Sequence, residues 1–249
     1  MQLTAVRADA EAARTLRQYY RTLLARLGPQ GWWPARTRLE VILGAILVQN
    51  TSWNNAARAI KRLREGGLLK LAPLRKVSPA SLEEFIRPAG FYRQKAAAIR
   101  GFLEFLERVA HGSLTRLFSL PAEKVRRELL RVRGFGPETV DAILLYAGRK
   151  PFFVADTYTR RILTRHSLLH ETAGYAEAQE FLHRHLLGDA SLFNEFHALL
   201  VEVGKRFCRR AEANCYACPL REFLPVATDK KADSDRASEP ASALTAQGG

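Results

Sequence analysis

The chain has 249 residues, and 47% of them are hydrophobic, so it can bury a sizeable core in one large domain or two modest lobes. Its 39 lysine and arginine residues outnumber 25 aspartate and glutamate residues, which gives a net charge of +14. This excess of positive charge favours a protein that binds a polyanion, most commonly nucleic acid, over a basic protein without such a partner. No segment is apolar for long enough to predict a membrane span.

The first twenty residues mix acids with bases and contain no continuous apolar segment, so they do not resemble a secretory signal. The sequence therefore predicts a cytoplasmic, nucleoid-associated protein, which we expect to be a monomer. Thiols stay reduced in that compartment, so we do not expect disulfides among the three cysteines.

The predicted secondary structure is almost entirely helical. Apolar residues recur at helical spacing over 10–27, and the glycines and proline of 28–31 end that helix. Residues 38–47 are nearly all apolar, which is typical of a buried helix. We expect further helices over 54–64, 80–87, 93–109, 122–131, 137–147, 157–165, 175–187 and 191–206. The segment KPFFVAD at 150–156 is the only tempting strand, and we interpret it as an extended connector, so the fold class is all-α.

The end of the chain differs from the rest. Residues 227–249 are rich in Ala, Ser, Asp and Lys without apolar periodicity, which predicts a disordered tail after a folded domain over 1–226.

A hairpin between two predicted helices is the most informative motif. In ELLRVRGFGPETVDAILLY, Gly134 and Gly136 allow a tight turn, Phe135 can plug back between the helices, and Pro137 starts the second helix. Backbone N–H groups at such a helix start attract a phosphate, and Arg131 and Arg133 suit the same anion. The pattern predicts a helix-hairpin-helix that clamps one DNA strand without reading its sequence. A plain turn between helices with a glycine cap is the alternative.

This hairpin, followed about twenty residues later by VADTYTRRIL, resembles the helix-hairpin-helix, Gly/Pro-rich, Asp motif (HhH-GPD) of the endonuclease III superfamily of DNA glycosylases. The segments GWWPARTRLEVILGAILVQNTSW, IRPAGFYRQKA and GFGPETVDAILLY look closest to 3-methyladenine DNA glycosylase III, in the same order and spacing. The resemblance implies two helical lobes with an active-site cleft between them. The central lobe spans about 38–147, and the N-terminal and C-terminal helices form the second lobe.

Asp156 falls where the family has its essential carboxylate. Cleavage of an N-glycosidic bond builds positive charge on the sugar, which a fixed carboxylate stabilises while it orients or deprotonates water. The alternative is that Asp156 only caps the helix that follows. Members with lyase activity carry a lysine where this chain has Glu138, so the resemblance implies a monofunctional hydrolase. Glu138 itself can simply complement the helix dipole.

A glycosylase must flip the damaged nucleotide and stack its base on aromatic side chains. Trp32, Trp33 and Trp53 are the only tryptophans, and the resemblance places them at the base pocket, where indoles suit a cationic alkylpurine. Burial as core anchors is the alternative for each of them.

The resemblance implies that further polar residues grip double-stranded DNA. Gln49 occupies the position that fills the gap left by the flipped base, and Asn50 follows it, although Asn50 can equally serve as a helix cap. The segment with Arg93, Gln94 and Lys95 resembles the part that wedges into the opposite strand and touches phosphates, and a solvated helix start is the alternative. For His197, a core or surface role is the simpler expectation.

The three cysteines follow the spacing C-x6-C-x2-C, at Cys208, Cys215 and Cys218, in a predicted loop over 208–218. Family members with a [4Fe–4S] cluster add a fourth cysteine six residues on, where this chain has Leu224, and no His or Cys follows Cys218. Two interpretations remain: a cluster with an incomplete cysteine set, or a loop with reduced thiols and no metal. Zinc is less favoured because structural zinc takes four ligands.

The sequence thus predicts a base excision repair enzyme that hydrolyses the N-glycosidic bond of damaged bases, preferably alkylated purines, in duplex DNA. The enzymatic alternative is an endonuclease III-type glycosylase that acts on oxidised pyrimidines and also cleaves abasic sites as a lyase. Such an enzyme would need an amine other than the family's lysine as its nucleophile. A non-catalytic helix-hairpin-helix DNA-binding module would explain the charge and the hairpin but not Asp156 or the tryptophans.

Overall fold

The computed structural model describes residues 2–225. Within this range the chain forms helices and no β-strand, and one isolated bridge joins Cys208 to Ala213. The expected all-α class is confirmed. The predicted disordered tail over 227–249 lies outside the described residues. No described helix is both long enough and apolar enough to cross a bilayer.

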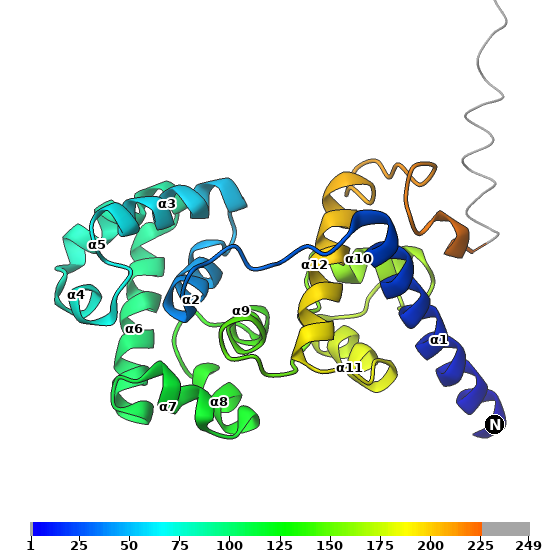
Figure 1. Cartoon of the computed structure of the whole chain (residues 1–249), viewed down its shortest axis with the longest axis horizontal. Coiled ribbons are helices and arrows are strands. Elements are labelled where there is room, and N and C mark those ends of the chain that lie inside the picture. The colour runs from blue at the N-terminus through cyan, green and yellow to red at the C-terminus, as the bar shows by residue number, and fades with distance from the viewer. Residues whose placement is uncertain (1, 226–249) are drawn as a thin grey trace, which may run out of the picture.

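Figure 1 shows two groups of helices, which we call the first and second lobes, in agreement with the expected architecture. The first lobe contains α2 (Arg38–Leu47), α3 (Trp53–Glu65), α4 (Leu71–Lys76), α5 (Pro79–Ile86), α6 (Tyr92–Ala110), α7 (Leu114–Ser119), α8 (Ala122–Leu129) and α9 (Pro137–Ala142), which continues as a π-helical segment over Ile143–Ala147. The second lobe contains α1 (Gln2–Leu27), α10 (Thr157–Arg165), α11 (Tyr175–His185) and α12 (Ala190–Arg206). Short 3-10 turns lie at Arg87–Ala89 and Arg221–Phe223.

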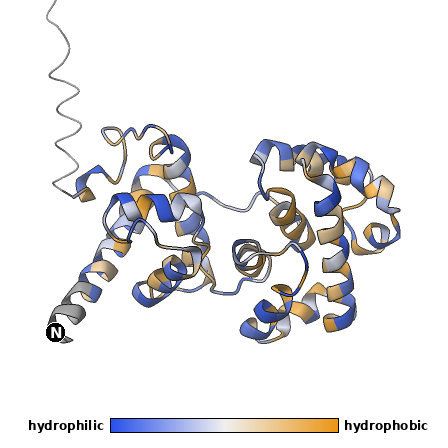
Figure 2. Ribbon diagram, turned by 180° about the vertical axis from the view of Figure 1, so that it is seen from behind, coloured by the Kyte–Doolittle hydropathy of each residue, from blue (hydrophilic) through white to orange (hydrophobic). Residues whose placement is uncertain are grey.

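Helix α2 is the central element of the first lobe. Thr37 caps its start by accepting a hydrogen bond from the backbone of Glu40 (3.2 Å), and every residue from Leu39 to Leu47 is buried. Figure 2 shows α2 as hydrophobic along its length, whereas the outer helices alternate between polar and apolar faces. A helix that is apolar all round needs partners on every side, and α2 packs against α3, α6, α9 and the π-helical segment.

The connector over 150–156 carries the chain from the π-helical segment to α10 and is neither helix nor strand, as expected. Phe152, Phe153, Val154 and Ala155 in it are all buried. Its backbone is held from α11, because the N–H of Phe153 donates to His183 Nε2 (2.9 Å). A buried, hydrogen-bonded connector fixes the position of the residue at its end, Asp156.

Candidate active site

A cleft of about 660 Å³ opens between the lobes. The end of α2 and the starts of α3 and α9 form one side of the cleft. The start of α10 and the inner face of α12 form the other side. The residues that the sequence singled out and that line this cleft are Trp32, Trp33, Gln49, Asn50, Trp53, Glu138 and Asp156. Tertiary folding therefore brings together segments more than one hundred residues apart.

Asp156 is the N-cap of α10. Its Oδ1 accepts a hydrogen bond from the backbone N–H of Thr159 (2.8 Å), so the capping role expected from sequence is present. The residue is 9% exposed and lines the cleft. A cap fixes the carboxylate in one orientation, and the second oxygen, Oδ2, is left for other contacts.

The second oxygen of Asp156 faces His197 on α12. His197 Nε2 lies 3.5 Å from Asp156 Oδ2, and it is a buried nitrogen without a hydrogen-bond partner in the described structure. The other ring nitrogen, Nδ1, pairs with the hydroxyl of Tyr146. Sequence analysis favoured a core or surface role for His197; the residue is buried, but it lines the cleft beside the carboxylate.

These neighbours decide the ionisation of Asp156. Burial acts to raise the pKa of its carboxyl, but the imidazole of His197 and the hydrogen bond from Thr159 outweigh burial and hold the pKa below its ordinary value. Asp156 is therefore an anion at neutral pH. Burial, followed by the charge of Asp156, raises the pKa of the Tyr146 hydroxyl, which keeps that group protonated.

The three tryptophans form one cluster at the cleft rather than three separate core anchors. The ring centroids of Trp32 and Trp53 lie 5.2 Å apart, as do those of Trp33 and Trp53. All three are half-buried, and Trp33 also packs on Tyr146 at 5.2 Å. A Cβ on Gly44 of α2 would lie 3.1 Å from Trp33 Nε1, so the glycine lets this indole lie close to the helix.

The hairpin has the expected local structure. Gly134 has φ +88°, and Phe135 is buried against Phe102 of α6, with ring centroids 6.4 Å apart. Gly136 caps α9 with φ −92°, and a Cβ there would meet no atom within 4 Å, so this side of the turn faces open space. Arg133 is exposed beside it.

Glu138 lies at the mouth of the cleft, in the first turn of α9. The residue is exposed and lines the cleft. Partial burial raises the pKa of this carboxyl, and the negative charge of Asp156 raises it further. Glu138 and Asp156 thus line the same cleft, and Glu138 stands at the position where the resemblance implies a lysine in members with lyase activity.

Gln49 and Asn50 follow α2 at the edge of the cleft. Gln49 Nε2 donates to the carbonyl of Gly134 (3.1 Å) and to Thr139 Oγ1 (2.7 Å), so it ties the end of α2 to the hairpin. Asn50 is exposed with φ +51°, a left-handed conformation that asparagine tolerates well.

The segment before α6 divides into exposed and buried parts. Arg93 and Gln94 are exposed, as is Phe91, which is 62% exposed at the N-cap of α6. Lys95 differs from the expectation of a phosphate contact, because it is 3% exposed and its Nζ donates to the carbonyls of Leu47 (2.9 Å) and Ala89 (2.8 Å). These bonds satisfy the last carbonyl of α2 and the last carbonyl of the 3-10 turn at Arg87–Ala89.

Sequence analysis missed Lys205, which lines the cleft from α12 with its ammonium 5.3 Å from the ring centroid of Trp32. It stands eight residues after His197 and therefore lies on the same helix face. Helical spacing from a cleft residue was the signal that could have found Lys205, but the sequence favoured a core or surface role for His197.

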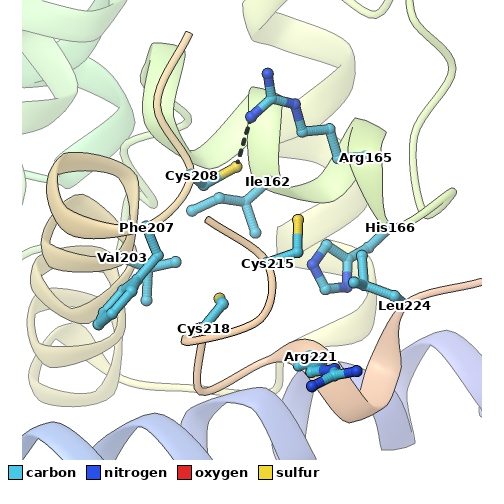
Figure 3. Close-up of a pocket in the computed structure, with 10 residues that line it drawn as sticks. All are labelled: Ile162, Arg165, His166, Val203, Phe207, Cys208, Cys215, Cys218, Arg221 and Leu224. Carbon is cyan, nitrogen blue, oxygen red and sulfur yellow. Dashed lines mark hydrogen bonds between the residues drawn. The ribbon is translucent and has the colours of Figure 1, made fainter. Parts of the chain in front are cut away.

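The cysteines lie away from the cleft, at the far end of the second lobe. Cys208, Cys215 and Cys218 line one small pocket between α10, the end of α12 and the last 3-10 turn (Figure 3). Within the part of the chain that the structure describes, no three His, Cys, Asp or Glu groups lie close enough to surround a single metal ion.

Comparison with known proteins agrees with this architecture. Residues 43–186 match the family described as HhH-GPD superfamily base excision DNA repair protein. A Methanocaldococcus jannaschii protein provisionally named as a DNA repair glycosylase is 42% identical over 206 residues, which cover 82% of this chain and 93% of that protein. Endonuclease III of Thermotoga maritima is 29% identical over 184 residues, covering 73% of this chain and 80% of that enzyme.

Solved structures have the same fold. Endonuclease III trapped as a covalent intermediate with DNA superposes with a TM-score of 0.74 at 20% identity, covering 88% of this chain and 98% of that one. The 3-methyladenine DNA glycosylase of H. pylori bound to 1,N6-ethenoadenine superposes with a TM-score of 0.65 at 26% identity, covering 80% of this chain and 97% of that one.

Proposed function

The chain belongs to the HhH-GPD superfamily of base excision DNA repair proteins, and we propose that it is a monofunctional DNA N-glycosylase that removes alkylated purines from duplex DNA. The observation that carries this proposal is a buried, ionised Asp156 in a cleft that has a tryptophan cluster on its wall. The fold similarity to a glycosylase bound to 1,N6-ethenoadenine supports a modified purine as substrate.

In this proposal the flipped base stacks in the tryptophan cluster. A positively charged alkylpurine gains cation–π attraction there, about 0.5–2 kcal/mol, which a neutral base lacks. The positive charge also makes the base a good leaving group. The cleft of about 660 Å³ is larger than a single nucleobase needs and leaves room for the sugar and a water molecule.

Asp156 then stabilises the positive charge that develops on the sugar and orients the attacking water. His197 acts on Asp156 and not on the base, because its Nε2 faces Oδ2 of the carboxylate. Hydrolysis without a covalent enzyme intermediate is supported by Glu138, which occupies the position of the lyase lysine and is not an amine nucleophile.

The DNA grip in this proposal uses the hairpin, with Gly134, Gly136 and Arg133 against a phosphate, and Gln49 and Asn50 beside the vacated base position. Arg93, Gln94 and the exposed Phe91 suit the opposite strand. Lys95 is left out of the grip, because its ammonium is buried and bound to carbonyls.

The test is excision of 3-methyladenine from a labelled duplex by wild-type protein and by Asp156→Asn. Asparagine keeps the size and most of the capping ability but removes the charge, so excision should fall about 100- to 1,000-fold while binding to abasic DNA is retained. Asp189→Asn is the matched control, since Asp189 caps α12 in the same way (2.9 Å to the N–H of Leu192) outside the cleft. Full activity of Asp156→Asn would contradict the proposal.

A second candidate function is abasic-site lyase activity, and Lys205 favours it because a cleft amine can attack an abasic sugar and form a Schiff base. We expect the monofunctional outcome: an abasic strand that breaks only after alkali, and no adduct after borohydride treatment. Strand cleavage without alkali, with a borohydride-trapped adduct that is lost in Lys205→Arg, would establish the lyase instead.

A further inference from the structure

His197 has a buried ring nitrogen that the hydrogen bonds of the cleft leave unused. Its Nε2 has no hydrogen-bond partner within residues 2–225, and this nitrogen lies 3.5 Å from Asp156 Oδ2. A neutral imidazole carries one hydrogen, on either Nδ1 or Nε2. If Nε2 is bare, its lone pair faces the carboxylate and repels it; if Nε2 carries the hydrogen, the ring is a donor aimed at the carboxylate. The tautomer of His197 therefore decides how it acts on Asp156.

Tyr146 occupies the other nitrogen of this ring. Its hydroxyl pairs with His197 Nδ1, and in the described part of the chain this hydroxyl has no second hydrogen-bond partner. Burial is the largest of the causes that raise the pKa of the hydroxyl, and the negative charges of Asp156 and Glu195 add to it. The hydroxyl therefore keeps its hydrogen, and that hydrogen needs an acceptor.

Only one form of His197 satisfies both of its neighbours. If Nδ1 carried the ring hydrogen, the tyrosine hydroxyl would accept it, and the hydroxyl hydrogen would be left buried without an acceptor, which is costly. If Nδ1 is bare, the hydroxyl donates to it and both groups are satisfied. The ring hydrogen is then on Nε2, directed at Asp156 Oδ2. A doubly protonated imidazolium meets the same objection, because its Nδ1 is also a donor.

The packing around Tyr146 holds its hydroxyl in this position. The ring of Tyr146 lies 5.2 Å from that of Trp33 and 5.8 Å from that of His197, measured between centroids. Tyr146 belongs to the π-helical segment Ile143–Ala147, whose turns contain more residues than α-helical turns and so rotate its side chains relative to an uninterrupted α-helix. The tyrosine therefore connects the tryptophan cluster of the cleft to the histidine beside the carboxylate.

We propose that Tyr146 is a positioning residue, which holds His197 as the Nε2–H tautomer and so directs a hydrogen-bond donor at Asp156. This inference rests on the proposed function, in which Asp156 must be ionised and held in one orientation. Donation to Oδ2 stabilises the carboxylate without cancelling its charge, whereas a positive imidazolium would offset the charge that stabilises the sugar cation. A shift of about 0.5 Å would shorten the separation to an ordinary hydrogen bond.

The test is 15N NMR of the full-length protein with 15N-labelled histidine at neutral pH, because the shifts of the ring nitrogens distinguish both tautomers and the imidazolium. The signals of His197 are those missing from the spectrum of His197→Gln. We expect the Nε2–H tautomer in the wild type. In Tyr146→Phe, which keeps the ring against Trp33 but lacks the hydroxyl, the Nδ1–H tautomer should become populated. Single-turnover excision of 3-methyladenine by this variant should fall about tenfold, while its affinity for abasic DNA is unchanged.

Tyr19→Phe is the matched control. The Tyr19 hydroxyl pairs in the same way with Nδ1 of His166 (2.7 Å), a residue of the cysteine pocket, and neither side chain lines the cleft. Excision and the tautomer of His197 should therefore not change in this variant.

Three results would each overturn the proposal: a wild type with the Nδ1–H tautomer or the imidazolium, an unchanged tautomer in Tyr146→Phe, or an undiminished excision rate in that variant. The wild-type spectrum decides by itself if Tyr146→Phe does not fold. If the wild type excises no 3-methyladenine, the proposed function fails, whereas the spectra of the two proteins still decide which ring nitrogen of His197 carries the hydrogen.

Discussion

Replacement of Asp141 should destabilise the protein more than replacement of any surface carboxylate. Asp141 lies on α9 and is fully buried. Its Oδ1 accepts from Arg126 Nε (2.7 Å), and its Oδ2 accepts from Arg126 Nη2 (3.0 Å), Tyr175 OH (2.9 Å) and Gln179 Nε2 (2.8 Å). Because Tyr175 and Gln179 belong to α11, this carboxylate joins the hairpin to the second lobe.

The expected loss for Asp141→Ala follows from these contacts. Removal of one partner of a buried ion pair costs about 3–5 kcal/mol, because the other charge stays buried without compensation. The side chain of Arg126 is 24% exposed and regains some hydration, so we expect the lower end, about 3 kcal/mol. For a chain of this size, that lowers the melting temperature by about 6–12 °C.

The assay is urea denaturation followed by circular dichroism, with two comparison variants. The double variant Arg126→Met/Asp141→Leu removes both charges and should lose less stability than Asp141→Ala alone. Glu180→Ala breaks an exposed pair with Arg184 and should cost no more than about 0.5 kcal/mol. The reasoning would be refuted if Asp141→Ala lowered the free energy of unfolding by less than about 1 kcal/mol. It would also be refuted if the double variant were less stable than Asp141→Ala.

Three further results are expected. His197→Gln removes a group that lowers the pKa of Asp156, so burial dominates and the pKa rises. The acid limb of the pH profile for single-turnover excision should therefore move to higher pH. If the acid limb does not move, His197 does not act through Asp156. Gly204→Val should impair excision while leaving DNA binding intact, because even a Cβ at Gly204 would lie within 3 Å of the Tyr158 side chain and push α10 away from α12. Full excision activity of this variant would disprove that reasoning. DNA affinity should fall steeply between about 50 and 200 mM salt with little dependence on sequence, and a flat titration would remove the argument from charge.

Local sequence signals predicted most helices well. The bounds of α2 and α10 agree residue for residue with the prediction, because Thr37 and Asp156 cap them through hydrogen bonds to residues three positions on. The predicted single helix over 137–147 was partly wrong, since it changes to π-helical geometry after Ala142. The short helices α4 and α7 were missed, because six residues are too few to show a helical period.

What the sequence by itself determined is the set of features that depend on neighbours along the chain: the helical class, the hairpin with buried Phe135, the capping residue Asp156 and the three cysteines. What only the tertiary structure decided are contacts between distant segments. It buried Lys95 on two carbonyls, put His197 beside Asp156, and brought His166 to the cysteines. The physical reason is that the environment of a side chain depends on which helices pack against it, and that packing follows from apolar burial over the whole chain rather than from local spacing.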